Sequence, residues 1–106
     1  MEDLSKHLTR NKAFLHALTE INKKQIKHLI DHADRSQIQS IVEILFNILK
    51  GNVEINETIF SILLKNKSKL RKIIEKQAWV KRKLLLNKTH SIIVKILKLI
   101  LPKIFE

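Results

Sequence analysis

Apolar residues recur with helical spacing over residues 35–50, and this is the clearest structural signal in the chain. They fall at i, i+3, i+4, i+7, i+10 and i+11, the pattern of an amphipathic helix that buries one face. The residues of this stripe are Ile38, Ile41, Val42, Leu45, Ile48 and Leu49. Asp34 followed by Gln37 predicts an N-cap with an approximate capping box, and Gly51 suits a left-handed C-terminal cap. We therefore expect a helix from residue 35 to residue 50.

Shorter amphipathic patterns predict helices on both sides of this segment. Before it, we expect two helices, over residues 4–18 and 22–32. After it, Asn56 is a candidate cap for a helix through Leu64, and the polar run 65–68 predicts a turn. Further short helices are expected after a cap at Ser68, around Trp79 to Leu86, and from Thr89 toward Pro102. Their expected buried residues before the last helix are Leu70, Ile73, Ile74, Val80 and Leu84.

The scarcity of turn residues indicates the fold class. The 106 residues include one Gly and one Pro, too few for strands joined by hairpins. At 44% hydrophobic, the chain is too apolar for a disordered basic tail. We predict an all-α fold, a compact single-domain bundle of five to seven short helices over residues 1–106.

Charge divides the chain into two halves. Residues 1–57 carry eight basic and eight acidic residues, whereas residues 58–106 carry thirteen basic residues and two acidic ones. The whole formal net charge of +11 therefore belongs to the second half. We expect a charge-neutral scaffold half and a strongly basic half whose surface faces an anionic partner.

Nine basic residues of the second half cluster within residues 65–83. They are Lys65, Lys67, Lys69, Arg71, Lys72, Lys76, Lys81, Arg82 and Lys83. An ordinary solvated helix face interleaves acids with bases, but Glu75 is the only acid from Thr58 to Phe105. The cluster predicts sequence-independent nucleic-acid binding through phosphate contacts, because Lys outnumbers Arg and aromatic side chains are nearly absent. Trp79 is the exception, since a solvent-facing indole there could touch a base or a lipid interface.

Few residues suggest chemistry other than binding. The chain has no Cys, and its single Gly excludes the glycine-rich phosphate loops. His28 and His32 stand at i, i+4 around Asp31 and could bind a divalent metal, but such pairs are more often solvated surface residues. We predict no catalytic residue, no metal site and no cofactor, and hence a protein that is not an enzyme.

The last predicted helix is strongly apolar. Every position from 92 to 101 is aliphatic except Lys95 and Lys98. A helix of this kind is either buried in a core or an oligomer interface, which we favour, or lies in a membrane interface. The run is too short to cross a membrane, which takes roughly 20 apolar residues. Contact of residues 90–105 with a membrane or a capsid remains an alternative.

From Ala33 onward the chain resembles the small basic proteins encoded by adintoviruses and related Maverick/Polinton elements. The matching features are Ala33-Asp34 at a helix start, Ile48-Leu49-Lys50-Gly51-Asn52-Val53, the cap at Ile55-Asn56, the run Lys81-Arg82-Lys83-Leu84-Leu85, and an apolar tail with Pro102. The chain departs from those proteins at residues 58–64, which are apolar rather than basic, and at residues 87–91, where the relatives often carry a Gly-Gly-Phe-Leu-type segment.

The resemblance implies a virion core protein that condenses a DNA genome, or an accessory protein inside the capsid. It implies the virion or the host nucleus as the location. The charge pattern agrees with the first function, so we expect non-enzymatic DNA binding by a protein that is a candidate homo-oligomer. Two alternatives stay open: a structural module that binds a partner or capsid protein, and a membrane-active protein that acts through its last helix.

Overall fold

Seven helices make up most of residues 5–105, the part of the chain that the computed structural model describes. They are α1 (Lys6–Arg10), α2 (Lys12–Glu20), α3 (Lys23–Asp31), α4 (Arg35–Leu49), α5 (Glu57–Ile74), α6 (Trp79–Lys88) and α7 (His90–Ile104). No strand occurs in this range. The predicted all-α bundle of five to seven helices is confirmed.

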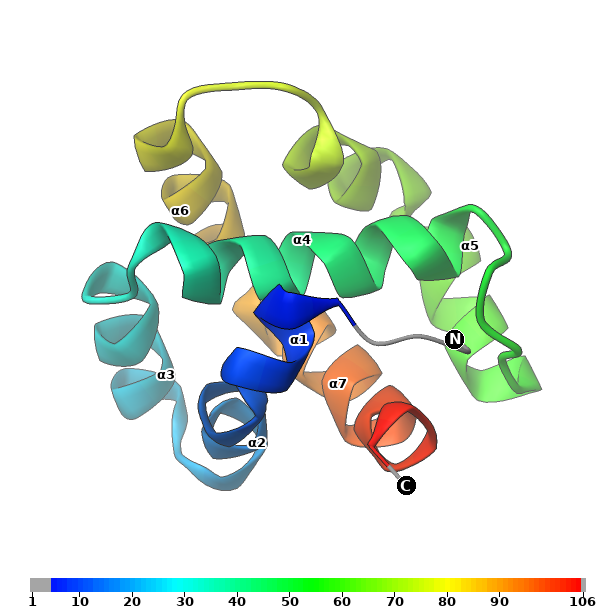
Figure 1. The fold of residues 1–106 in the computed structure, drawn as a ribbon. Coiled ribbons are helices and arrows are strands. Elements are labelled where there is room, and N and C mark those ends of the chain that lie inside the picture. Colours follow the sequence, from blue (N-terminus) through cyan, green and yellow to red (C-terminus); the bar gives the residue numbers. More distant parts are fainter. Residues whose placement is uncertain (1–4, 106) are drawn as a thin grey trace.

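The two halves of the chain are interleaved around one core. Helix α4 crosses the middle of the molecule, with α1 and α2 below it in the view of Figure 1 and α5 running behind its C-terminal end. Helix α2 packs against α7, and α3 packs against α6. Ile41, Ile44 and Leu45 of α4 are fully buried, as are Ile96 and Leu97 of α7. The neutral and basic halves therefore contribute to the same hydrophobic core.

Helix α4 begins and ends as its sequence predicts. The Asp34 carboxylate accepts a hydrogen bond of 2.8 Å from the Gln37 backbone N–H, and the Gln37 side chain accepts one of 2.9 Å from the Asp34 N–H. At the other end Gly51 has φ +77°, which an L-residue with a Cβ rarely adopts. The predicted cap at Asn56 is also confirmed, since its side chain accepts a hydrogen bond of 2.9 Å from Ile59 N–H.

The helix predicted over residues 4–18 is instead two helices that meet at Asn11. Residue 4 lies outside the described range. Asn11 is buried, and its amide nitrogen donates to the His7 carbonyl at 2.7 Å and to the Ser36 carbonyl at 3.1 Å. The bond to Ser36 connects the junction of α1 and α2 to α4. The spacing of residues around Asn11 does not indicate this contact, because α4 is distant in the chain.

The turn predicted at residues 65–68, with a new cap at Ser68, is wrong. Helix α5 runs through this segment without a break. Three residues of this run are exposed and Asn66 is half-buried, while Leu63 and Leu70, seven residues apart on the buried side, hold the helix to the core. The side chain of Asn66 donates to the Ile62 carbonyl at 2.9 Å, one turn earlier in the same helix, so this side chain does not interrupt the helix.

Helix α7 contributes its apolar face to the core. Its buried residues are Ile93, Ile96, Leu97, Ile100, Leu101 and Ile104. Thr89 precedes the helix as predicted, but its hydroxyl donates to the Leu85 carbonyl at 2.8 Å and does not cap α7. This burial supports the core interpretation of the last helix over the membrane one. Among the described residues, no helix combines the length and the hydropathy needed to cross a membrane.

Candidate nucleic-acid interface

The continuous α5 helix aligns three of the predicted lysines. Lys65, Lys69 and Lys72 stand at i, i+4 and i+7 and are all exposed. At 1.5 Å rise per residue this row, which we call the α5 row, extends about 10 Å along the helix. That length is about three base-pair steps of a DNA strand. The row exists because the turn predicted at residues 65–68 does not form.

Two other predicted cations of α5 lie on a different side of the helix. Lys67 and Arg71 are exposed, but at about 100° per residue Lys67 lies about 160° around the helix from Lys65 and Lys69, and Arg71 lies about 100° from Lys72. Lys67 borders a hollow beside Gly51, and Arg71 borders one beside Lys50. They therefore extend the positive charge toward the end of α4.

Arg82 donates to the backbone of α5 and is less exposed than predicted. It is half-buried, and its Nε donates to the Ile73 carbonyl at 2.9 Å while Nη2 donates to the Glu75 carbonyl at 2.7 Å. The last carbonyls of a helix have no partner within the helix and carry partial negative charge. Arg82 satisfies this need at the C-terminal end of α5.

Lys83 does the same for α3, so its predicted exposure is also wrong. The side chain is half-buried, and Nζ donates to the backbone carbonyls of Asp31 and Ala33, the latter at 3.2 Å. Both carbonyls lie at the C-terminal end of α3. Two successive cations of α6 thus donate hydrogen bonds to carbonyls at the C-terminal ends of two other helices. The other seven of the nine predicted residues are exposed.

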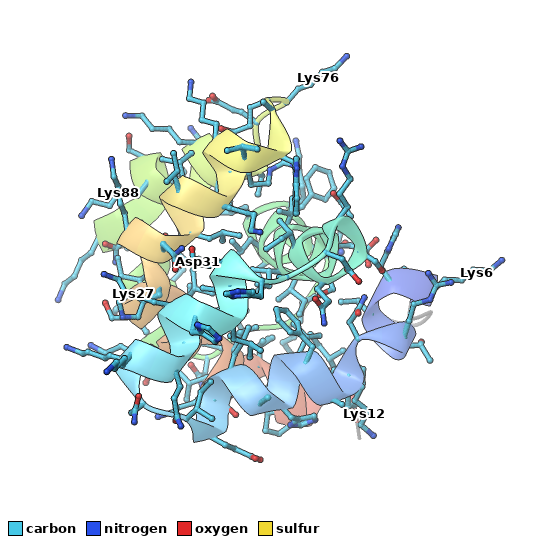
Figure 2. All side chains as sticks on the ribbon, turned by 90° about the vertical axis from the view of Figure 1, so that its left-hand side faces the viewer. Lys6, Lys12, Lys27, Asp31, Lys76 and Lys88 are labelled. Atoms are coloured by element: carbon cyan, nitrogen blue, oxygen red, sulfur yellow. The ribbon has the colours of Figure 1, made fainter. Side chains whose placement is uncertain are left out.

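The remaining predicted cations extend the surface beyond α5. Lys76 follows the end of α5 and Lys81 lies on α6, and both are exposed. Figure 2 shows Lys76, Lys88 and Lys27 on the side of the molecule formed by α6 and α3. Sequence reasoning left out Lys27 because it belongs to the charge-neutral half. Only the packing of α3 against α6 brings it to this surface.

Two residues predicted to be buried are exposed on α6. Val80 is 61% exposed and Leu84 is 59% exposed. They stand at i, i+4 and lie next to Lys81 and Lys88 on one side of the helix, whereas the fully buried Leu86 faces away from them. The face of α6 that packs against the core therefore contains Leu86 and not Val80 or Leu84, which the sequence predicted to be buried.

Trp79 is only half-buried and packs against the core. The Lys83 ammonium lies 4.4 Å from its ring centroid, and the Arg35 guanidinium carbon lies 5.8 Å from it. Both distances are within the range of cation–π attraction. The fully solvent-facing indole considered from the sequence is therefore not observed.

The histidine pair of α3 forms as its spacing predicts, but without a third ligand. The rings of His28 and His32 have centroids 4.2 Å apart, and His32 Nδ1 lies 3.0 Å from the His28 carbonyl oxygen. Among residues 5–105, no group of three or more His, Cys, Asp or Glu side chains could hold a metal ion.

Comparisons with known proteins add no family to this description. No family model, no curated protein and no solved structure matches the chain.

Proposed function

We propose that this protein binds DNA without sequence preference, through phosphate contacts made by the exposed cations of α5 and α6. The observation that carries the proposal is the α5 row, three lysines aligned on one exposed helix side. Among residues 58–88 the only acid is Glu75, which follows the end of α5, and the one acid within α5, Glu57, lies eight residues before Lys65, so few carboxylates compete with phosphate near the row.

The side-chain chemistry favours backbone contact over base readout. Lysine is a flexible point charge that suits phosphate neutralisation, whereas bidentate base recognition uses arginine, asparagine or glutamine. Among the predicted cations, the two arginines are Arg71 and Arg82, and Arg82 already donates to two backbone carbonyls. We also propose that the protein condenses a genome in a virion, which is the role that the resemblance implies, and that it has no enzymatic activity.

The test is the salt dependence of binding to a short labelled duplex, measured by fluorescence anisotropy. If four to six of the seven exposed cations meet phosphates, log K against log salt concentration has a slope of about −4 to −5. Lys69→Glu/Lys72→Glu should weaken binding to duplexes of different sequence about equally and make the slope about 2 units shallower.

The matched control is Lys6→Glu/Lys12→Glu, which makes the same change in charge away from α6 and α3 (Figure 2). It should alter the affinity much less. No binding at low salt, or the same loss from both double variants, would contradict the proposal.

A protein partner is the second candidate function, and exposed aromatic surface favours it. Phe60 and Leu64 of α5 are 53% and 60% exposed, and they border an apolar hollow with Ile48 and Leu49 at the end of α4. Exposed apolar side chains that gather at one place are typical of interaction sites. This hollow, rather than α7, is where a partner or a second copy would dock.

A further inference from the structure

We propose that a pocket between the start of α4 and the start of α6 binds one unpaired nucleotide, with its base against Trp79. This inference rests on the proposed function and names a second mode of it, the capture of a base that is not in a duplex. The pocket has a volume of about 330 Å³, which is within the size range of small-ligand sites. It is lined by Arg35, Ile38, Gln39, Gln77, Ala78, Trp79 and Arg82.

The lining offers the groups that a nucleotide needs. The indole of Trp79 supplies a flat surface for stacking once the Arg35 guanidinium, whose carbon lies 5.8 Å from the ring centroid, turns from the ring toward the phosphate. Bases pulled out of a helix stack on aromatic rings or guanidinium planes. Arg35 and Arg82 supply positive charge for the phosphate. The Gln39 amide supplies a donor and an acceptor for the edge of a base, and the Gln77 amide oxygen supplies a further acceptor.

Two of these side chains are held in place by the backbone of α5. Arg82 donates through Nε and Nη2 to carbonyls at the end of that helix, which leaves its other N–H groups free of those bonds. The Gln77 amide nitrogen donates to the Lys72 carbonyl at 2.6 Å and to the Ile73 carbonyl at 3.2 Å, which leaves its oxygen as an acceptor. Groups fixed in advance lose little conformational entropy when a ligand binds.

The position of the indole selects against duplex DNA. Trp79 is half-buried at the wall of the pocket, so a base must leave its stack to reach it. Bases of a duplex are already stacked and paired, and taking one out costs a few kcal/mol. The pocket therefore favours single strands or free nucleotides, while the α5 row contacts phosphates of either form.

The single tryptophan of the chain, which has no tyrosine, gives a direct test. Adenosine monophosphate, a single-stranded oligonucleotide and its duplex are each titrated against the intact protein, and Trp79 fluorescence is followed. We expect saturable quenching by the single strand and by the nucleotide, and little by the duplex. Quenching by the strand at much lower concentration than by the nucleotide assigns the pocket to strands, whereas equal potency assigns it to free nucleotides.

Variants separate this pocket from the surface of the proposed function. Arg35→Gln and Trp79→Leu should weaken single-strand binding by about fivefold or more, the range of a lost base–aromatic or phosphate contact. Duplex binding, followed by the anisotropy of labelled DNA, should change little. Arg35 is exposed, so its variant stays informative if Trp79→Leu unfolds. Arg10→Gln, another exposed arginine, is the matched control.

The outcomes distinguish the two proposals. Duplex binding with a steep salt slope, but with no quenching by strand or nucleotide, would overturn the pocket and leave the proposed function intact. Equal quenching by duplex and single strand, unaffected by Arg35→Gln, would overturn it as well. Loss of all DNA binding would contradict the proposed function, and the pocket would then stand only on quenching by the nucleotide.

Discussion

Replacing Lys83 by Met tests whether this cation serves the fold rather than the DNA. The change removes the hydrogen bonds from Nζ to the carbonyls of Asp31 and Ala33, and keeps an unbranched stem that packs as before. Asp31 is exposed, so water replaces the lysine at its carbonyl at little cost, whereas Ala33 is buried at 3% exposure. The loss at Ala33 therefore dominates the expected effect.

The size of the effect follows from these contacts. A hydrogen bond to a charged group contributes about 1.5–3 kcal/mol, and the attraction between the ammonium and Trp79 adds about 0.5–1 kcal/mol. With partial exposure of Lys83 taken into account, we expect a loss of about 2 kcal/mol in the free energy of unfolding. For a domain of this size that loss lowers the Tm by about 8–10 °C.

The assay is urea unfolding followed by circular dichroism, with Lys81→Met as the matched control. Lys81 is exposed on the same helix, so its variant removes the same charge and relieves the same repulsion. The difference between the two variants isolates the contacts of Lys83. The salt slope of DNA binding should fall for Lys81→Met and stay unchanged for Lys83→Met. Equal unfolding midpoints for the two variants would refute the structural role.

Two further changes test the helix boundaries and the core. Gly51→Val places a β-branched residue at φ +77°, where no atom beyond the neighbouring residues lies within 4 Å of an added Cβ. The expected loss of about 1–2 kcal/mol in the free energy of unfolding is therefore due to backbone strain. Thermal melting measures this loss, and an unchanged Tm would mean that α4 does not end in a left-handed cap. Leu97→Ala truncates a fully buried side chain and should lower the free energy of unfolding, measured by chemical denaturation, by about 2–5 kcal/mol. Leu84→Ala, at an exposed position, should lower it far less, and similar losses for the two variants would place α7 outside the core.

Local signals allowed the prediction of α4 but not of α5. The start of α4 depends on Asp34 and Gln37, which are neighbours in the chain, and its end depends on Gly51. For α5 the polar run at residues 65–68 suggested a turn, because four polar residues in succession interrupt an apolar stripe. Three of the four are exposed, and the helix is held by apolar residues on either side of the run.

The candidate site could be predicted in part. Its overall charge and its location in the second half follow from sequence, and seven of the nine predicted cations are exposed. The roles of Arg82 and Lys83 depend on where the ends of α5 and α3 lie in space. The pocket beside Trp79 depends on Arg35, which is distant in the chain. Such contacts arise from the packing of helices that are distant in the chain, so no local pattern of residues in the sequence indicates them.

The contact between α2 and α7 has a consequence for how the chain reaches its fold. Helix α2, which buries Phe14, Leu15 and Leu18, packs against α1 and α4 but makes its most extensive contact with α7, the helix that is synthesised last. In a bundle of sequential neighbours each helix pair closes as soon as it is made, but here closure requires a contact of high sequence separation. Part of the apolar surface of α2 therefore stays uncovered until α7 is made, and a chain whose elongation stalls before α7 is expected to aggregate.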